Sequence, residues 1–206
     1  MKDFSGKIAV VTGGGNGMGR ELTKQLAEAG CSVAICDISE KDMTETVSAA
    51  EALAPQGVRI THFRADVGKE EDVQAFADHV RTAHETDHIH LVINNAGIGG
   101  GGSFVTGPRE NWERTFNVCW YGVYNNARAF MPMLVAADEG HIVNVSSVNG
   151  FWASIGPDTP HTAYSAAKFA VKGFTEALIT DLRLNAPHVK ASVVMPGHIG
   201  TQIALN

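Results

Sequence analysis

A chain of 206 residues is long enough to bury one sizeable hydrophobic core, so we expect a single domain over residues 1–206. Hydrophobic residues make up 44% of the chain and charged residues 18%, a balance that excludes a largely disordered protein. The formal net charge of −6 comes without a basic cluster, so we expect neither nucleic acid nor a membrane among its partners. Cys31, Cys36 and Cys119 lack metal-ligand spacing, and the first residues lack a secretory signal. We therefore expect a soluble, cytoplasmic protein with reduced thiols.

Short apolar runs alternate with longer helical patterns along the whole chain. We expect strands at about 8–11, 32–36, 58–63, 91–93, 142–145 and 189–195. Helical patterns lie between them at about 17–29, 39–53, 70–84, 108–137 and 162–185. The alternation predicts an α/β fold of Rossmann type, a doubly wound parallel sheet of six strands with helices on both faces.

A glycine-rich turn, Thr-Gly-Gly-Gly-Asn-Gly-Met-Gly at residues 12–19, joins the first expected strand to the first expected helix. Glycines let the backbone take positive φ and allow a ligand to approach closely, and the free N–H groups at a helix start attract anions. The turn therefore predicts a site for a phosphate-bearing ligand. Its expected cofactor contacts are Gly13, Asn16, Gly17, Met18 and Gly19.

Asp37 ends the second expected strand, where a dinucleotide-binding fold places the acid that bonds the adenosine ribose hydroxyls. This position indicates NAD. The carboxylate would repel the 2′-phosphate of NADP, and Asn16 in the turn supplies no cation to neutralise it, so NADP is less favoured. Taken without the turn, Asp37 is equally well explained as a residue that begins a helix.

Tyr164 and Lys168 lie four residues apart in an expected helix, so their side chains project from one face. A phenol has a pKa of about 10, and a nearby ammonium stabilises its phenolate, which allows the tyrosine to act as an acid or base at neutral pH. Ser147, at the end of the fifth expected strand, could donate a hydrogen bond to a substrate oxygen. Alone, such a Tyr and Lys pair usually marks a solvated helix face.

These motifs, taken together, resemble the short-chain dehydrogenase/reductase family in order and spacing over the whole chain. The resemblance is carried by Thr12-Gly-x-x-x-Gly17-x-Gly19, Asp66-Val67, Asn94-Asn95-Ala96-Gly97, Asn117, Ser147, Tyr164-x-x-x-Lys168 and Pro196-Gly197. It implies reversible hydride transfer between NAD and a secondary alcohol or ketone. In this family the tyrosine is the general acid/base, the lysine lowers its pKa and holds the nicotinamide ribose, and the serine orients the carbonyl. The resemblance thus assigns catalysis to Ser147, Tyr164, Lys168 and Asn117, with Asn117 supporting a proton-relay water.

The same resemblance implies further cofactor contacts after the later strands. Asp66 and Val67 would hold the adenine, and Thr201 would meet the carboxamide. The full expected set beyond the glycine turn and Asp37 is Asp66, Val67, Asn94, Ala96, Gly97, Tyr164, Lys168, Pro196, Gly197, Ile199 and Thr201.

Two features differ from the family pattern. The interval between Ser147 and Tyr164 is longer than in many members, and we interpret it as a loop that shapes the pocket, with Phe151, Trp152, Pro157 and Pro160. Relatives also continue beyond the position of Asn206 through a substrate-covering segment, another helix and a seventh strand. We expect these C-terminal elements to be missing from this sequence.

Aromatic residues recur every four positions in the long helical segment at 108–137, namely Trp112, Phe116, Trp120 and Tyr124. Core packing is the default explanation of such a stripe. The family usually pairs this helix and the Tyr164 helix across a subunit boundary, so the resemblance implies a homo-oligomer, a dimer or tetramer.

His84-Glu-Thr-Asp-His88 matches the His-Glu-x-x-His pattern of zinc proteases. That pattern needs both histidines on one helical face, whereas this stretch falls where a helix ends, so we expect a polar connector and no metal site.

Two other functions remain open from the residues alone. A non-catalytic NAD-binding sensor or regulatory protein of the same fold would keep the cofactor site and have no turnover. A methyltransferase would use a similar glycine turn and strand-end acid, but it gives no reason for Tyr164 and Lys168.

Overall fold

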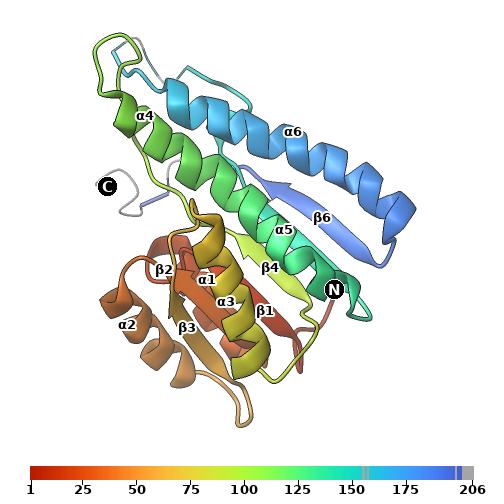
Figure 1. Ribbon diagram of the computed structural model, residues 1–206. Coiled ribbons are helices and arrows are strands. Elements are labelled where there is room, and N and C mark those ends of the chain that lie inside the picture. Colours follow the sequence, from red (N-terminus) through yellow and green to blue (C-terminus); the bar gives the residue numbers. More distant parts are fainter. Residues whose placement is uncertain (155, 157, 198, 201–206) are drawn as a thin grey trace.

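The computed structural model describes residues 1–154, 156, 158–197 and 199–200, and six parallel strands form its centre (Figure 1). The strands are β1 Ile8–Thr12, β2 Ser32–Asp37, β3 Ile60–Arg64, β4 Leu91–Asn94, β5 Gly140–Val145 and β6 Val189–Val194. They lie in the order β3-β2-β1-β4-β5-β6, so the direction of winding reverses between β1 and β4. This sheet confirms the predicted doubly wound α/β fold.

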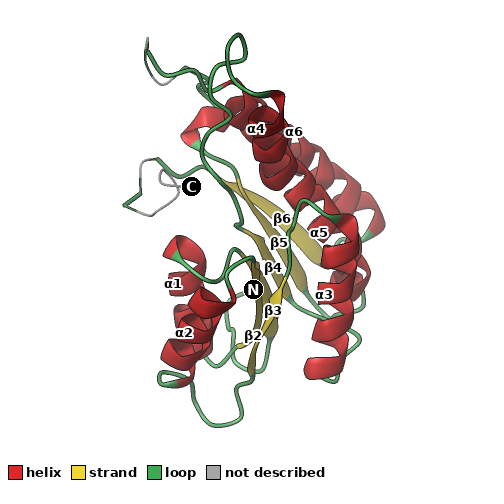
Figure 2. Cartoon of the chain, turned by 60° about the vertical axis from the view of Figure 1, so that its left-hand side comes forward, coloured by secondary structure: helices red, strands yellow, loops and turns green. Residues whose placement is uncertain are grey.

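Helices cover both faces of the sheet, as Figure 2 shows. The helices are α1 Gly17–Glu28, α2 Glu40–Glu51, α3 Glu70–Ala83, α4 Arg109–Phe116, α5 Gly122–Val135 and α6 Thr162–Asn185. One face carries α1 and α2, and the other carries α3, α5 and α6. Each face buries its own apolar cluster, because alternate residues of a strand point to opposite sides. No helix in the described ranges is long and apolar enough to span a membrane.

Local sequence explains where several elements begin and end. The fully buried run from Val33 to Cys36 suits an interior strand of a parallel sheet. Ser39 caps α2 by accepting a hydrogen bond from Asp42 N, and Gly30, with φ of +82°, follows the end of α1.

The long helical region predicted at 108–137 is present, but it is divided. A π-helical turn at Asn117–Tyr121 separates α4 from α5, with Gly122 N bonded to Asn117 O five residues back. Such turns insert one extra residue into a helix and are common at functional sites. The 3.6-residue pattern of the sequence continues through the turn, so the sequence alone predicted one helix.

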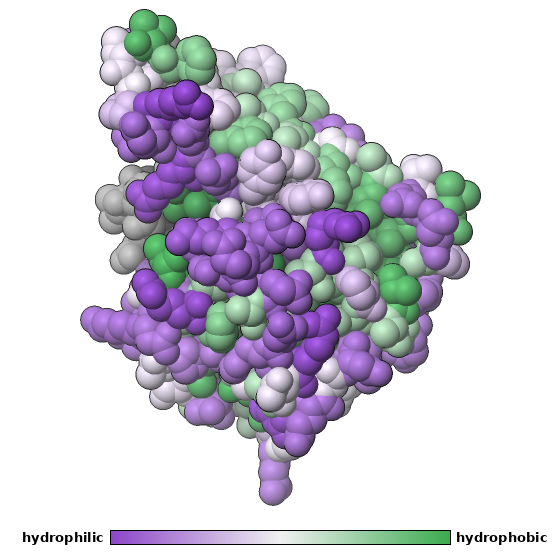
Figure 3. All heavy atoms as spheres, in the orientation of Figure 1, coloured by the Kyte–Doolittle hydropathy of each residue, from purple (hydrophilic) through white to green (hydrophobic). Residues whose placement is uncertain are grey.

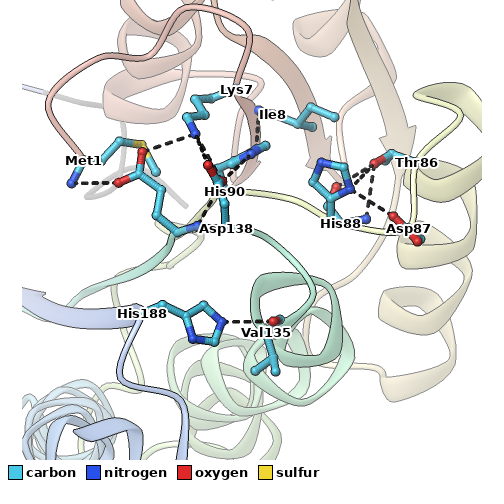
Figure 4. Close-up of polar contacts among 11 residues, drawn as sticks. Met1, Lys7, Ile8, Thr86, Asp87, His88, His90, Val135, Asp138 and His188 are labelled. Atoms are coloured by element: carbon cyan, nitrogen blue, oxygen red, sulfur yellow. Dashed lines mark hydrogen bonds and ion pairs between the residues drawn. The ribbon is translucent and has the colours of Figure 1, made fainter.

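Charged and imidazole side chains join the N-terminal arm to the rest of the molecule at the end of β1 opposite the glycine turn (Figure 4). Lys7 Nζ lies 3.3 Å from Asp138 Oδ1 and 3.2 Å from Glu139 Oε1. His90 Nδ1 accepts a hydrogen bond from Ile8 N at 3.1 Å, and burial lowers the pKa of His90. These contacts keep the arm on the sheet with a neutral imidazole at their centre.

Buried histidine should make the stability of this protein sensitive to acid. His84 is 9% exposed, its Nε2 lies 2.9 Å from Thr61 Oγ1, and burial lowers its pKa from 6.5 to about 4. The unfolded chain therefore binds this proton first, so stability is full above pH 6.5 and falls as the pH drops toward 4. The loss from this residue should be on the order of 3 kcal/mol.

Urea unfolding at about pH 7.5, above this titration, and at about pH 4.5, near its lower end, measures the effect. His84→Gln keeps a donor near Thr61 but does not titrate, so it should remove most of that residue's share of the acid loss. His188→Gln, at a partly buried histidine whose Nε2 contacts Val135 O, is the matched control. An equal acid loss in His84→Gln and the parent protein would refute the assignment.

Candidate active site at the carboxyl edge of the sheet

The glycine turn after β1 can be formed only by glycines at several positions. Gly13 and Gly17 have φ of +65° and +53°, a region that side chains disfavour. A Cβ on Gly19 would lie 2.0 Å from Gly13 O, and one on Gly14 would lie 2.5 Å from Ile35 Cβ. The turn is therefore packed tightly against both α1 and β2.

Asn16 and Met18 complete the turn from opposite sides. Asn16 is exposed and caps α1, its side-chain oxygen accepting a hydrogen bond from Gly17 N at 2.7 Å. Met18 is partly buried and packs against the apolar cluster beneath α1. Asn16 thus stands where it can also face a ligand, while Met18 mainly supports the turn.

Thr12 at the end of β1 is hydrogen-bonded to the residues just after β4, where the winding of the sheet reverses. Thr12 Oγ1 accepts hydrogen bonds from Asn95 N and Ala96 N, both at 3.0 Å. Asn95 Nδ2 donates in return to Thr12 O at 3.0 Å and Gly13 O at 3.2 Å. This arrangement holds the glycine turn against the loop after β4, at the edge where doubly wound sheets bind ligands.

Asn94 lies deeper than its predicted role as a cofactor contact suggests. It is 2% exposed, and its Nδ2 donates to Asn144 Oδ1 at 2.8 Å, while Asn144 Nδ2 donates to Thr175 Oγ1 at 2.9 Å. The side chain therefore links β4, β5 and α6. Gly97, three residues later, is nearer the site, because a Cβ there would lie 3.6 Å from Lys168 Nζ.

Asp37 and Asp66 both hold their local backbone with a carboxylate oxygen. Asp37 Oδ2 accepts from Gly15 N and Oδ1 from Ser39 N, each at 3.1 Å, so its carboxylate is oriented beside the glycine turn. Asp66 Oδ1 accepts from Gly68 N at 3.0 Å. Val67 is 6% exposed and packs beneath this edge.

Ser147, Tyr164 and Lys168 meet at the carboxyl edge, beside the loop after β4. All three are buried, and the Ser147 hydroxyl lies close enough to the Tyr164 phenol to lower its pKa. Lys168 Nζ lies 5.4 Å from the centre of the Tyr164 ring and donates to Val145 O at 2.9 Å. The start of α6 therefore brings a phenol and an ammonium to the end of β5.

Burial dominates the proton affinities of this group. It raises the pKa of Tyr164 above its ordinary value, and the hydrogen-bonding contact with Ser147 opposes that rise. Burial also lowers the pKa of Lys168. The sequence predicted a lowered tyrosine pKa, whereas desolvation has the larger effect in the protein without ligand.

Asn117 stands apart from these three residues. It begins the π-helical turn and is exposed, and its Cβ lies 3.6 Å from the position of a Cβ on Gly68. Within the described part of the chain, its side chain makes no hydrogen bond to Ser147, Tyr164 or Lys168.

The segment after β6 approaches the site from the other side. Pro196 O accepts a hydrogen bond from Val148 N at 3.0 Å, next to Ser147. Gly197 and Ile199 are exposed, and Thr201 lies outside the described residues.

His161 is a site neighbour that the sequence analysis missed. Its ring stacks on Tyr164, with ring centres 4.7 Å apart and planes 23° apart, and its Nδ1 is buried and has no hydrogen-bond partner among the residues that the structure describes. Its place three residues before Tyr164, on the same side of a helix, was the available signal.

The zinc-protease pattern does not form a metal cluster. His84 contacts Thr61, and His88 Nδ1 lies 2.9 Å from Asp87 Oδ1. Across the described ranges, no three potential histidine, cysteine or carboxylate ligands are grouped to hold a metal.

Comparison with known proteins shows which family the chain belongs to. The family model described as short chain dehydrogenase matches residues 7–206. The chain belongs to the short chain dehydrogenase family. Among its relatives is SadH of Mycobacterium tuberculosis, which is named as an oxidoreductase. The chain is 41% identical to SadH over 206 residues. The match covers 100% of this chain and 71% of SadH.

Solved members of the short chain dehydrogenase family share the fold. A Burkholderia phymatum member in complex with NAD superposes with a TM-score of 0.88 at 34% identity, covering 98% of this chain and 69% of that one. A metagenomic member in complex with NADP superposes with a TM-score of 0.82 at 29% identity, covering 95% and 84%. The fold thus occurs with either cofactor in related proteins.

Proposed function

We propose that this protein transfers a hydride between NAD(H) and a secondary alcohol or ketone, with Tyr164 as general acid/base. The observation that carries the proposal is the meeting of Ser147, Tyr164 and Lys168 at the edge that also holds the glycine turn. A sensor that only binds the cofactor would have no use for a phenol paired with a serine hydroxyl and a buried ammonium.

The residues of the turn fit a dinucleotide. Gly13 and Gly19 leave no room for side chains, and the first turn of α1 presents backbone N–H groups, of which Gly17 N already donates to Asn16 Oδ1. Asp37 supports NAD over NADP, since its carboxylate would repel a 2′-phosphate, and Asn16 offers no positive charge. The choice of NAD is our inference from these two residues.

The proposed roles follow from where each group lies. The nicotinamide, when bound, supplies the hydride acceptor or donor and, in its oxidised form, a positive charge. Tyr164 exchanges the hydroxyl proton of the substrate, and Ser147 donates a hydrogen bond to the same substrate oxygen. Lys168 keeps an ammonium near the phenol, favouring the phenolate against the effect of burial.

A cavity of about 360 Å³ lies between the loop after β4 and the start of α4. Another cavity, of about 390 Å³, lies at the opposite end of the sheet. The cavity beside α4 is lined by Ser103, Phe104, Gly107, Pro108, Arg109, Trp112 and Glu113. Trp112 Nε1 donates to Thr162 Oγ1 at 3.0 Å, two residues before Tyr164. This cavity is our candidate for part of the substrate side, accepting a small molecule.

A direct assay tests the proposal. Purified protein is incubated with NAD⁺ and a panel of secondary alcohols, and NADH formation is followed by absorbance. Turnover of at least one alcohol is expected. Binding of NAD⁺ by calorimetry without any turnover would favour the non-catalytic sensor, and binding of S-adenosylmethionine in place of NAD⁺ would favour a methyltransferase.

We also propose that the protein forms a homo-oligomer through two helical segments. One is the segment of α4 and α5, which carries Trp112, and the other is α6, which carries Tyr164. Figure 3 shows apolar residues gathered over the face formed by α5 and α6. On these helices Tyr124 and Phe169 remain 41% and 44% exposed. Large exposed apolar groups side by side commonly mark an interface.

Gel filtration at micromolar concentration should therefore give a dimer or tetramer. Phe169→Glu, which places a charge in the middle of this face, should shift the protein to a monomer. Leu184→Glu, near the far end of α6 and 77% exposed, is the matched control and should leave the assembly intact. A parent protein that elutes as a monomer would contradict the interface.

A further inference from the structure

Both ends of the Gly15 residue are held by side chains. Gly15 N donates to Asp37 Oδ2 at 3.1 Å, while Gly15 O accepts from Arg20 Nε and from Thr46 Oγ1, each at 3.0 Å. An acid and a base thus meet at one residue of the turn, Asp37 on its amide side and Arg20 on its carbonyl side.

The guanidinium of Arg20 is turned toward α2. Its Nε is also 3.0 Å from Thr46 Oγ1, and its Nη2 lies 3.3 Å from Glu45 Oε2 and 3.4 Å from Asp42 O. The Arg20 side chain is 28% exposed, so Glu45 compensates a charge that is only partly solvated. The guanidinium of Arg20, which contacts the turn, is therefore already paired.

Asp37 and Arg20 contact the same residue of the glycine turn, Gly15, from its amide and carbonyl sides. Resting on the proposed function, the ribose hydroxyls of the cofactor would face Asp37, with Arg20 on the carbonyl side of Gly15. A guanidinium is well suited to bind phosphate, because its donors form a planar fork. In this structure its Nε and Nη2 are held by Gly15, Thr46 and Glu45.

We propose that Arg20 is a latent ligand for a 2′-phosphate and that Glu45 restrains it. Cofactor choice then depends on three residues: Asp37 repels the phosphate, Arg20 could attract it, and Glu45 neutralises Arg20 and adds repulsion. Proteins commonly discriminate between two ligands by repelling the wrong one as well as by denying it a favourable contact.

Other charges surround this end of the sheet and must be separated from Arg20. Lys41 Nζ lies 4.0 Å from Glu45 Oε1, and Arg64 Nε donates to Ile38 O at 3.1 Å, on the strand beside β2. Glu40 Oε1 lies 2.9 Å from His62 Nε2, and within the described part of the chain Glu40 does not contact Arg20. Glu40 therefore serves as a matched carboxylate on the same helix.

The test measures NADP⁺ and NAD⁺ affinity by calorimetry, with no substrate needed. Asp37→Ser removes the repelling charge but keeps an oxygen that can accept from Gly15 N. In that background, Glu45→Gln should strengthen NADP⁺ binding by about fivefold, the effect expected of one partly exposed charge pair, while Glu40→Gln should not. Equal gains from the two exchanges, or no gain from Glu45→Gln, would overturn the proposal.

The cation is then assigned in the Asp37→Ser, Glu45→Gln background. Adding Lys41→Gln or Arg64→Gln should leave the NADP⁺ gain in place, and its loss in either variant would overturn the role of Arg20. Adding Arg20→Gln should abolish the gain. If Arg20→Gln also weakens NAD⁺ binding, by removing the hydrogen bond to Gly15 O, the Lys41→Gln and Arg64→Gln variants still test whether Arg20 binds the 2′-phosphate. Failure of the parent protein to bind NAD⁺ would instead refute the proposed function.

Discussion

Replacing Tyr164 with phenylalanine should lower the rate of alcohol oxidation by roughly 10²- to 10⁴-fold, the range expected for losing a positioned general acid/base. The substitution removes one hydroxyl that lies against Ser147 and keeps the ring on which His161 stacks. We therefore expect the fold and the position of Lys168 to survive, and NAD⁺ affinity to change by less than about threefold. Rates are measured with an alcohol that the parent protein oxidises, and affinity by calorimetry.

Tyr124→Phe is the matched control for this experiment. Tyr124 lies on α5, is 41% exposed and contacts Trp120, so its hydroxyl should not affect turnover. Full activity in Tyr164→Phe would remove the acid/base role. Equal losses in both variants would point to a general effect of removing a tyrosine hydroxyl.

Gly19→Ala should disrupt the glycine turn and with it NAD⁺ binding. The added Cβ would lie 2.0 Å from Gly13 O, a backbone atom that cannot rotate away, so either the turn or the start of α1 must move. Overpacking of this kind costs typically about 1–3 kcal/mol of folding stability. A displaced turn should also weaken NAD⁺ binding by at least about tenfold, which calorimetry and urea unfolding together measure.

Gly173→Ala provides the opposite case in α6. Apart from the neighbouring backbone of α6, no heavy atom of the described residues lies within 4 Å of the Cβ position at Gly173, and alanine is favoured over glycine inside a helix by about 1 kcal/mol. This variant should be as stable as the parent or more so, with unchanged NAD⁺ affinity. If Gly19→Ala behaved like Gly173→Ala, close packing of the turn would not explain its glycines.

Much of the fold follows from local patterns. The alternation of apolar runs and helical segments predicted six strands in a doubly wound parallel sheet, and the structure has them. The prediction failed to divide the helix at 108–137, because the π-helical turn at Asn117–Tyr121 shifts one hydrogen bond without interrupting the amphipathic pattern. A change in one backbone hydrogen bond leaves almost no signal in residue type.

Part of the candidate site could also be predicted from local patterns in the sequence. Glycines of the turn and the spacing of Tyr164 and Lys168 are local features, and their chemistry depends on residue type. Burial depends on the rest of the chain, and it raises the pKa of Tyr164 in the protein without ligand, opposite to the effect expected from Lys168 alone. Likewise, Asn94 turns to Asn144, a partner 50 residues away.

By itself, the sequence determined the family and the doubly wound architecture and predicted the residues of the candidate site, because periodicity and functional groups act over a few neighbouring positions. Only the tertiary structure decided how those groups are solvated and paired. It stacked His161 on Tyr164, buried Lys168 against Val145, and paired Arg20 with Glu45 beside Asp37. Each of these depends on distances between elements, which helix and strand packing sets and local sequence does not encode.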